Sequence, residues 1–207
     1  MPATGTQMNA MIALARWAQR LLDKTRKLDF LALVALRLYL APIFWVAGVM
    51  KYHNFDDTVS WFADDLHMPV PWLMAFLATA AEIGGAASLV LGFALRWMCI
   101  PMMVTMGVAI VTVHWQNGWL SVAEGMGIFA NERTMQAAQK LAEAKEILME
   151  HGDYDALTQF GSLVILNNGV EFAATYLVML AVLFFWGAGN YLSVDYWIRR
   201  RFMSPSP

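Results

Sequence analysis

Residues 72–92 read WLMAFLATAAEIGGAASLVLG, and this stretch decides the fold class. It carries one ionisable side chain, Glu82, in an otherwise uncharged and mostly apolar run. A helix needs about 20 such residues to cross the hydrocarbon layer of a bilayer. Backbone polar groups find no water in that layer, so the run is expected to be a helix, whose backbone bonds to itself. The sequence therefore predicts a membrane-spanning helix over 72–92.

The composition of the whole chain agrees with a membrane protein. Of its 207 residues, 59% are hydrophobic and only 14% are charged, whereas about a quarter of an average soluble domain is charged. This excludes a soluble domain, and the high apolar and aromatic content excludes a disordered chain. The single cysteine, Cys99, rules out an internal disulfide and a cysteine-only metal cluster. The net charge of −2 argues against a nucleic-acid partner.

Three further stretches have the length and composition of membrane spans, and they cover residues 30–50, 97–116 and 172–192. With 72–92 they predict an all-α membrane protein, a four-transmembrane-helix bundle in contact with the lipid bilayer. The small residues of the second span recur every fourth position: Ala80, Gly84, Ser88 and Gly92. This spacing is typical of closely packed helices, so we expect these residues to serve packing.

Lysine and arginine are distributed unevenly between the two sides of the predicted bundle. Nine lie on the side of the termini and the 2–3 turn: Arg16, Arg20, Lys24, Arg26, Lys27, Arg96, Arg199, Arg200 and Arg201. Four lie in the loops of the other side: Lys51, Arg133, Lys140 and Lys145. Basic residues favour the cytoplasmic side. The sequence therefore predicts a multi-pass protein of a plasma membrane with cytoplasmic N and C termini.

Two segments outside the spans have helical periodicity. Residues 1–29 predict an amphipathic helix with one basic face, lying at the membrane interface; a topology signal alone is the alternative. Residues 132–150 predict a second amphipathic helix, which begins after Asn131, ends at Gly152 and caps the outer face of the bundle. The predicted organisation has three parts: the interfacial segment 1–29, the transmembrane domain 30–197 and the cytoplasmic tail 198–207.

Two ionisable residues lie deep in the predicted spans, where charge is costly and indicates function by default. By helical rise, Arg37 lies about 10 Å and Glu82 about 15 Å from the cytoplasmic ends of their spans. We therefore expect an Arg37–Glu82 ion pair between the first two helices. This pair would either fix helix packing or hold an ionised carboxylate that accepts a proton or anchors a ligand.

Four more polar residues fall at one level near the outer ends of the spans: Lys51, His53, His114 and Glu171. A histidine at a helix end commonly serves as an interfacial hydrogen-bonding group, but four polar side chains from three helices favour a site. We predict Glu82 and His114 as catalytic residues. The predicted substrate-binding residues are Arg37, Lys51, His53 and Glu171.

The remaining motifs give little sign of a resident cofactor. Met98, Met102 and Met106 repeat every fourth residue beside Cys99, and soft sulfur ligands suit Cu(I), so copper handling is a minor alternative to packing. Because packing is the main interpretation of these methionines, we predict no metal site. No dinucleotide or Walker motif is present, and a single histidine within the spans argues against haem. Electrons in any redox role would reside on a bound carrier or a partner.

Several residues in this order resemble the DoxX family of small four-helix membrane proteins. The similar segments are Arg37, Gly48–Lys51, Met68–Pro71, Glu82–Gly85, Leu91–Gly92, Arg96, His114, Gly169–Phe172, Gly187–Gly189 and Ser193–Asp195. The resemblance covers about residues 30–197. Asn190 stands where the family often has an arginine, and the outer segment from about 119 to 165 is longer than in short members.

The resemblance implies a bacterial inner membrane protein associated with an oxidoreductase system. In this interpretation the chain is a membrane subunit that binds a quinone or similar small hydrophobe between its helices, with no intrinsic cofactor. Its partner would be a soluble or membrane oxidoreductase, and oligomerisation is compatible with the sequence. The alternative is a non-catalytic chaperone, assembly factor or lipid-binding protein.

Overall fold

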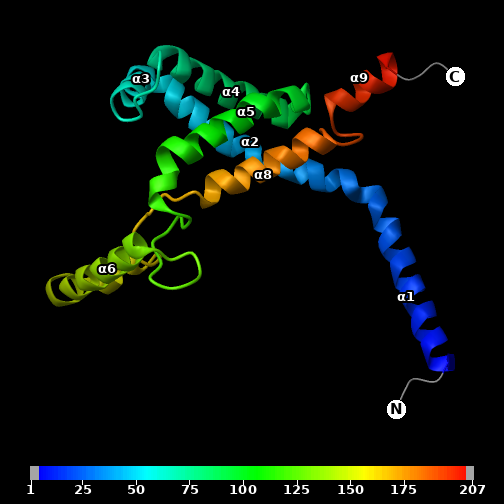
Figure 1. Cartoon of the computed structure of the whole chain (residues 1–207), viewed down its shortest axis with the longest axis horizontal. Helices are drawn as coiled ribbons and strands as arrows, with labels where there is room; N and C mark the ends of the chain where they lie inside the picture. Colours follow the sequence, from blue (N-terminus) through cyan, green and yellow to red (C-terminus); the bar gives the residue numbers. More distant parts are fainter. Residues whose placement is uncertain (1–4, 204–207) are drawn as a thin grey trace.

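The computed structural model describes residues 5–203, and Figure 1 shows a helical bundle with helices projecting from its two ends. Every named element in this range is a helix, and one isolated antiparallel bridge joins Val122 to Leu166. The predicted all-α class is therefore confirmed. Helices α1 and α9 lie at one end of the bundle, and α3 and α6 lie at the other (Figure 1).

Three helices are long and apolar enough to cross a membrane. They are α2 (Asp29–His53), α4 (Pro71–Leu91) and the helix that begins as α5 (Leu95–Ala109). The last continues through a π-helical turn, η2 (Ile110–His114), and a 3-10 turn, η3 (Trp115–Asn117). These confirm the first three predicted spans within a few residues at each end.

The fourth predicted span is only partly helical. Helix α8 (Glu171–Trp186) has 16 residues, a rise of about 24 Å, whereas the hydrocarbon layer is about 30 Å thick. The helix ends because Gly187 and Gly189 adopt φ values of +78° and +84°, which the α-helix does not allow. Residues 187–193 continue as irregular chain, where the sequence predicted helix as far as 192.

The bundle is built from two helix pairs. Helix α2 packs along α4, α5 packs along α8, and α4 also contacts α5 beside the short turn that joins them. The buried core lies between the pairs and includes Leu40, Phe44, Leu89, Leu95, Met102, Leu180 and Leu183.

Small residues on α4 allow close approach between these helices. Gly84 and Gly85 lie against the side chains of Met98 and Met102, and Ser88 is buried. The packing role predicted for the small residues is therefore confirmed for Gly84, Ser88 and Gly92, which lies against Ser193. It was wrong for Ala80, which is exposed. Gly48 of α2 is in equally close contact with Ile83 of α4.

Both amphipathic segments form helices. Helix α1 (Gly5–Thr25) runs through a 3-10 turn, η1 (Arg26–Leu28), into α2, and its interfacial location remains a prediction. Helix α6 (Glu132–His151) begins at a capping box between Asn131 and Thr134, and Gly152 follows its last residue. Its predicted bounds were therefore correct.

The placement of α6 as a cap was wrong. Figure 1 shows α6 extending away from the bundle, and hydrogen bonds join the start of this helix to neighbouring loops. Arg133 Nε donates to Asn167 Oδ1 at 3.0 Å, and Asn131 Nδ2 donates to the Asn117 carbonyl at 3.4 Å.

Three short helices complete the fold. Helix α3 (Phe55–Asp64) follows α2 and packs on α4, α7 (Tyr154–Thr158) follows α6, and α9 (Val194–Phe202) precedes the end of the chain. The sequence analysis did not predict α3, whose buried Thr58 and Phe62 face the bundle. This helix closes one end of the space described next.

Candidate functional site

A cavity of about 1160 Å³ lies between the helices. Its walls are α2 and α4 on one side and α5, η2 and α8 on the other, and α3 contributes Thr58, Trp61 and Phe62 at one end. Figure 1 shows that the two helix pairs meet beside the α4–α5 turn and diverge toward α3. The residues that line the cavity belong to the diverging parts of these helices. Most of its lining is apolar, so its few polar side chains define what it can bind.

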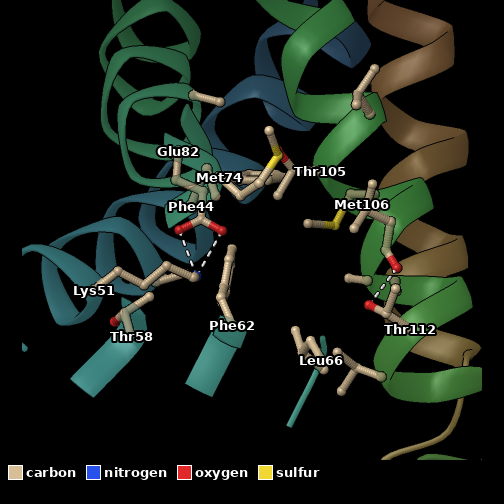
Figure 2. A pocket seen from close by; sticks show the side chains of 18 of the residues that line it. Phe44, Lys51, Thr58, Phe62, Leu66, Met74, Glu82, Thr105, Met106 and Thr112 are labelled. Atoms are coloured by element: carbon tan, nitrogen blue, oxygen red, sulfur yellow. Dashed lines mark hydrogen bonds and ion pairs between the residues drawn. The ribbon is translucent and has the colours of Figure 1, made fainter. Parts of the chain in front are cut away.

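One ion pair lies in the α2–α4 wall. Lys51 Nζ donates to both carboxylate oxygens of Glu82, at 2.8 Å to Oε1 and 2.7 Å to Oε2. The Glu82 side chain is 4% exposed and that of Lys51 is 24% exposed. Figure 2 shows the pair beside Phe62, with Thr58 next to Lys51 and with Met106 and Thr112 across the cavity. The charged pair is thus presented to an otherwise apolar space.

The predicted Arg37–Glu82 ion pair is wrong. Arg37 is 3% exposed, and its guanidinium donates to four backbone carbonyls instead. Nε donates to Leu89 at 2.7 Å, Nη2 to Val90 at 2.9 Å, and Nη1 to Ala188 and Leu192, both at 2.9 Å.

The reason for this difference lies in the ends of the helices. The last carbonyls of α4 have no partner within the helix, and the chain after α8 is not helical. These carbonyls need donors, and Arg37 supplies them. Glu82 lies against Gly48, about 16 Å along α2 from Arg37 and one turn before Lys51, so Lys51 reaches it and Arg37 does not.

His114 reaches the cavity from the opposite wall, at the end of the π-helical turn η2. Its Nδ1 lies 2.9 Å from the carbonyl oxygen of Asn168, whose φ is +56°. Because a carbonyl can only accept, Nδ1 is the donor in this hydrogen bond, and Nε2 is the ring nitrogen left for another partner. Single π-helical turns within α-helices occur frequently at functional sites.

Besides Arg37, two predicted site residues lie outside the cavity lining. The Glu171 Oε2 accepts the backbone N–H of Ser121 at 3.0 Å, which joins the start of α8 to the preceding loop. His53 is exposed at the end of α2, with its ring 5.6 Å from that of Tyr52. Of the six predicted residues, the structure brings Lys51, Glu82 and His114 to one cavity and places the other three elsewhere.

Sequence reasoning assigned no role to several polar residues near these sites, among them Thr58 and Asp195. Thr58 lines the cavity beside Lys51 and donates to the Asn54 carbonyl at 2.8 Å. Asp195 accepts the N–H groups of Ala94 and Leu95 at 2.8 Å and 3.1 Å, and so caps the start of α5. The Ser193-x-Asp195 pattern was a signal for a cap, but its partner, 100 residues away, was not visible in the sequence.

Comparison with known proteins was made for the whole chain. A family model described as DoxX matches residues 32–115. Inner membrane protein YphA of Escherichia coli (strain K12) is 31% identical over 96 residues, which cover 46% of this chain and 66%, just under two thirds, of that protein. These matches confirm the resemblance to the DoxX family for residues 32–115. No solved structure matches it at a significant level.

The DoxX match bears directly on the cavity. Residues 32–115 include most of α2, all of α3, α4 and α5, and the turn η2. Lys51, Glu82 and His114 therefore all belong to the DoxX portion. Helix α8, which completes the opposite wall, lies beyond the match.

Two methionines of the stripe predicted as a minor copper alternative have packing partners. Met102 is fully buried against Gly85, and Met98 lies against Gly84. Cys99, which lies beside them in the sequence, is also buried. Within residues 5–203 no group of three or more His, Cys, Asp or Glu residues is placed to hold a metal ion. The geometry favours packing as the role of this stripe.

Proposed function

We propose that this DoxX-like protein binds a quinone or a similar small hydrophobe in its interhelical cavity and serves an oxidoreductase system as a membrane subunit. The single observation that carries the proposal is an apolar cavity of about 1160 Å³ with an ion pair in one wall and a histidine in the other. Ligand sites are typically apolar clefts with a few convergent polar groups. The apolar lining would bury the ring and tail.

The polar side chains suit the chemistry of a quinone. Reduction to the hydroquinone consumes two electrons and two protons, and the electrons would come from a partner oxidoreductase. Lys51 can donate a hydrogen bond to one carbonyl oxygen of the quinone. Glu82 and His114 can accept and return protons, because each is a titratable group at the cavity wall.

We propose further that the protein crosses a bacterial inner membrane four times, with both termini in the cytoplasm. Helix α8 is short for a span, and the irregular residues 187–193 would lie at membrane depth. Such backbone is tolerated where it is buried in protein and bonded. Ala188 is 2% exposed, and Arg37 binds the carbonyls of Ala188 and Leu192, which supports a crossing completed by this segment.

A second candidate is a non-catalytic assembly or lipid-binding protein. The observation that favours it is helix α6, which projects from the bundle and exposes Met135, Ile147 and Met149. Exposed apolar side chains on a projecting helix are suited to docking a partner.

The test is organic extraction of the gently purified protein followed by mass spectrometry. Replacing Ala78, which lines the cavity on α4, with Phe should displace the ligand. Ala80→Phe is the matched control, because Ala80 is exposed two residues further on and does not line the cavity. We expect a stoichiometric quinone from the wild type and Ala80→Phe, and its loss from Ala78→Phe. A specific lipid, or a co-purifying protein without ligand, would favour the second candidate.

A further inference from the structure

The cavity carries almost no net charge. Among the described residues that line it, the only side chains of the types Lys, Arg, Asp and Glu are those of Lys51 and Glu82. These two form one ion pair. Arg37 is committed to four carbonyls and does not line the cavity. A ligand head group therefore meets a neutral pair and not an unpaired cation.

The geometry of the pair opposes an anionic head group. Both carboxylate oxygens of Glu82 lie within 2.8 Å of the Lys51 ammonium, so any anion that approaches this nitrogen also approaches the carboxylate. Repulsion from Glu82 then offsets attraction to Lys51. Both forces are strong in an apolar surrounding, and placing like charges together is costly there.

The same pair can still bind an uncharged polar head. An ammonium has three N–H donors, and two of those of Lys51 are used on Glu82. The third can donate to a carbonyl or hydroxyl oxygen. Each carboxylate oxygen has further lone-pair capacity and can accept a bond from a hydroxyl.

We infer that this cavity selects amphiphiles with an uncharged carbonyl or hydroxyl head and rejects those with an anionic head, and that Glu82 sets this selectivity. The inference rests on the proposed binding of a hydrophobe in the cavity. It narrows the ligand class to quinones, hydroquinones, isoprenoid or fatty alcohols and similar neutral molecules. It excludes fatty acids and anionic phospholipids as occupants.

The test uses two probes with the same brominated alkyl chain, one ending in an alcohol and one in a permanently ionised sulfonate. Bromine quenches tryptophan fluorescence on contact, and Trp61 lines the cavity. The chain has 9 tryptophans. Quenching that is lost in Trp61→Phe therefore isolates occupancy of the cavity from partition into the surrounding detergent.

For the wild type we expect the alcohol to bind at least roughly tenfold more tightly than the sulfonate. Glu82→Gln keeps the shape of the side chain and leaves Lys51 with an uncompensated charge, so sulfonate affinity should rise by roughly tenfold or more. The double variant Lys51→Met/Glu82→Gln removes both charges and should lose this gain. Glu143→Gln, the same change on exposed α6, should behave as the wild type.

Equal binding of the two probes to the wild type would overturn the selectivity without any variant. So would a folded Glu82→Gln protein whose preference is unchanged, or a double variant that binds the sulfonate as well as Glu82→Gln does. If Glu82→Gln does not fold, the wild type and the uncharged double variant still test the alcohol preference, because both must show it. Lys51→Met then tests Glu82, because its uncompensated carboxylate must lower sulfonate affinity below that of the double variant, and equal affinities would overturn the role of Glu82. Absence of Trp61-dependent quenching by either probe would instead overturn the proposed binding itself.

Discussion

At the scale of single residues, Arg37 has the largest set of hydrogen bonds described in the bundle interior. From α2 it donates to Leu89 and Val90 at the end of α4 and to Ala188 and Leu192 after α8. A carbonyl without a donor is costly in an apolar environment, and one cation supplies the donors for all four carbonyls. We interpret Arg37 as a structural residue that joins three parts of the chain.

Replacing Arg37 with Met should destabilise the protein strongly. The change keeps an unbranched apolar side chain but leaves four carbonyls without their donor. We expect a loss of on the order of 3–5 kcal/mol in the free energy of unfolding, measured by circular dichroism in mixed micelles. Arg96→Met is the control, because exposed Arg96 donates one bond, to the Phe184 carbonyl at 2.8 Å, and should lose only about 1 kcal/mol. Equal losses in the two variants would contradict this role.

At the scale of elements, the contact between α2 and α4 holds the ion pair in place. Gly48 allows the two helices to approach closely one turn before Lys51, and Glu82 lies directly opposite. A methyl group at Gly48 would lie 2.7 Å from Ile83 Cγ1 and 3.0 Å from the Ile83 backbone nitrogen. The backbone atom cannot turn aside, so the helices would have to separate.

Gly48→Ala should therefore destabilise the bundle by about 1–3 kcal/mol and weaken the Lys51–Glu82 contact. Thermal unfolding in detergent measures the first effect, and binding in the cavity reports the second. Gly107→Ala on α5 is the matched control, because a methyl group there meets nothing within 4 Å. Alanine favours helix more than glycine does, so the control should be neutral or slightly stabilised. The prediction fails if the two variants have the same melting temperature.

At the scale of the whole molecule, the two helix pairs meet at one end and diverge at the other. Core residues, Arg37 and the Asp195 cap lie where the pairs meet. The cavity, the ion pair and His114 lie where they diverge, toward α3 and α6. The buried core thus lies at one end of the bundle, and the cavity lies at the other.

Four crossings require both termini on one side of the membrane and α6 on the other. The native Cys99 is buried, so single cysteines introduced in a Cys99→Ser background report accessibility. Gln139→Cys on α6 should react with an impermeant maleimide on intact spheroplasts. Gln19→Cys and Met203→Cys, both exposed at the other end, should react only after lysis. Labelling of Met203→Cys from outside would show that α8 and the residues after it do not complete a span.

Much of the fold could be predicted from local sequence, because it depends on local properties. Apolar run length predicted α2, α4 and the α5 helix, and the Asn131 and Gly152 signals predicted both ends of α6. Each of these depends on neighbouring residues alone. The DoxX resemblance came from the order of such segments along the chain, and the family comparison confirmed it.

Only the tertiary structure decided which polar groups meet. Depth along a helix placed Arg37 within reach of Glu82, but it did not reveal that α8 stops at Trp186 and leaves carbonyls that need a donor. Lys51, predicted as a rim residue, is the partner of Glu82 because α2 packs on α4 with Gly48 opposite Glu82, one turn before Lys51. The cavity arises because two helix pairs diverge, and that angle depends on contacts between residues far apart in sequence. The partner of a charged side chain and the volume of a cavity both depend on how the helices pack. Neighbouring residues in the sequence do not determine that packing.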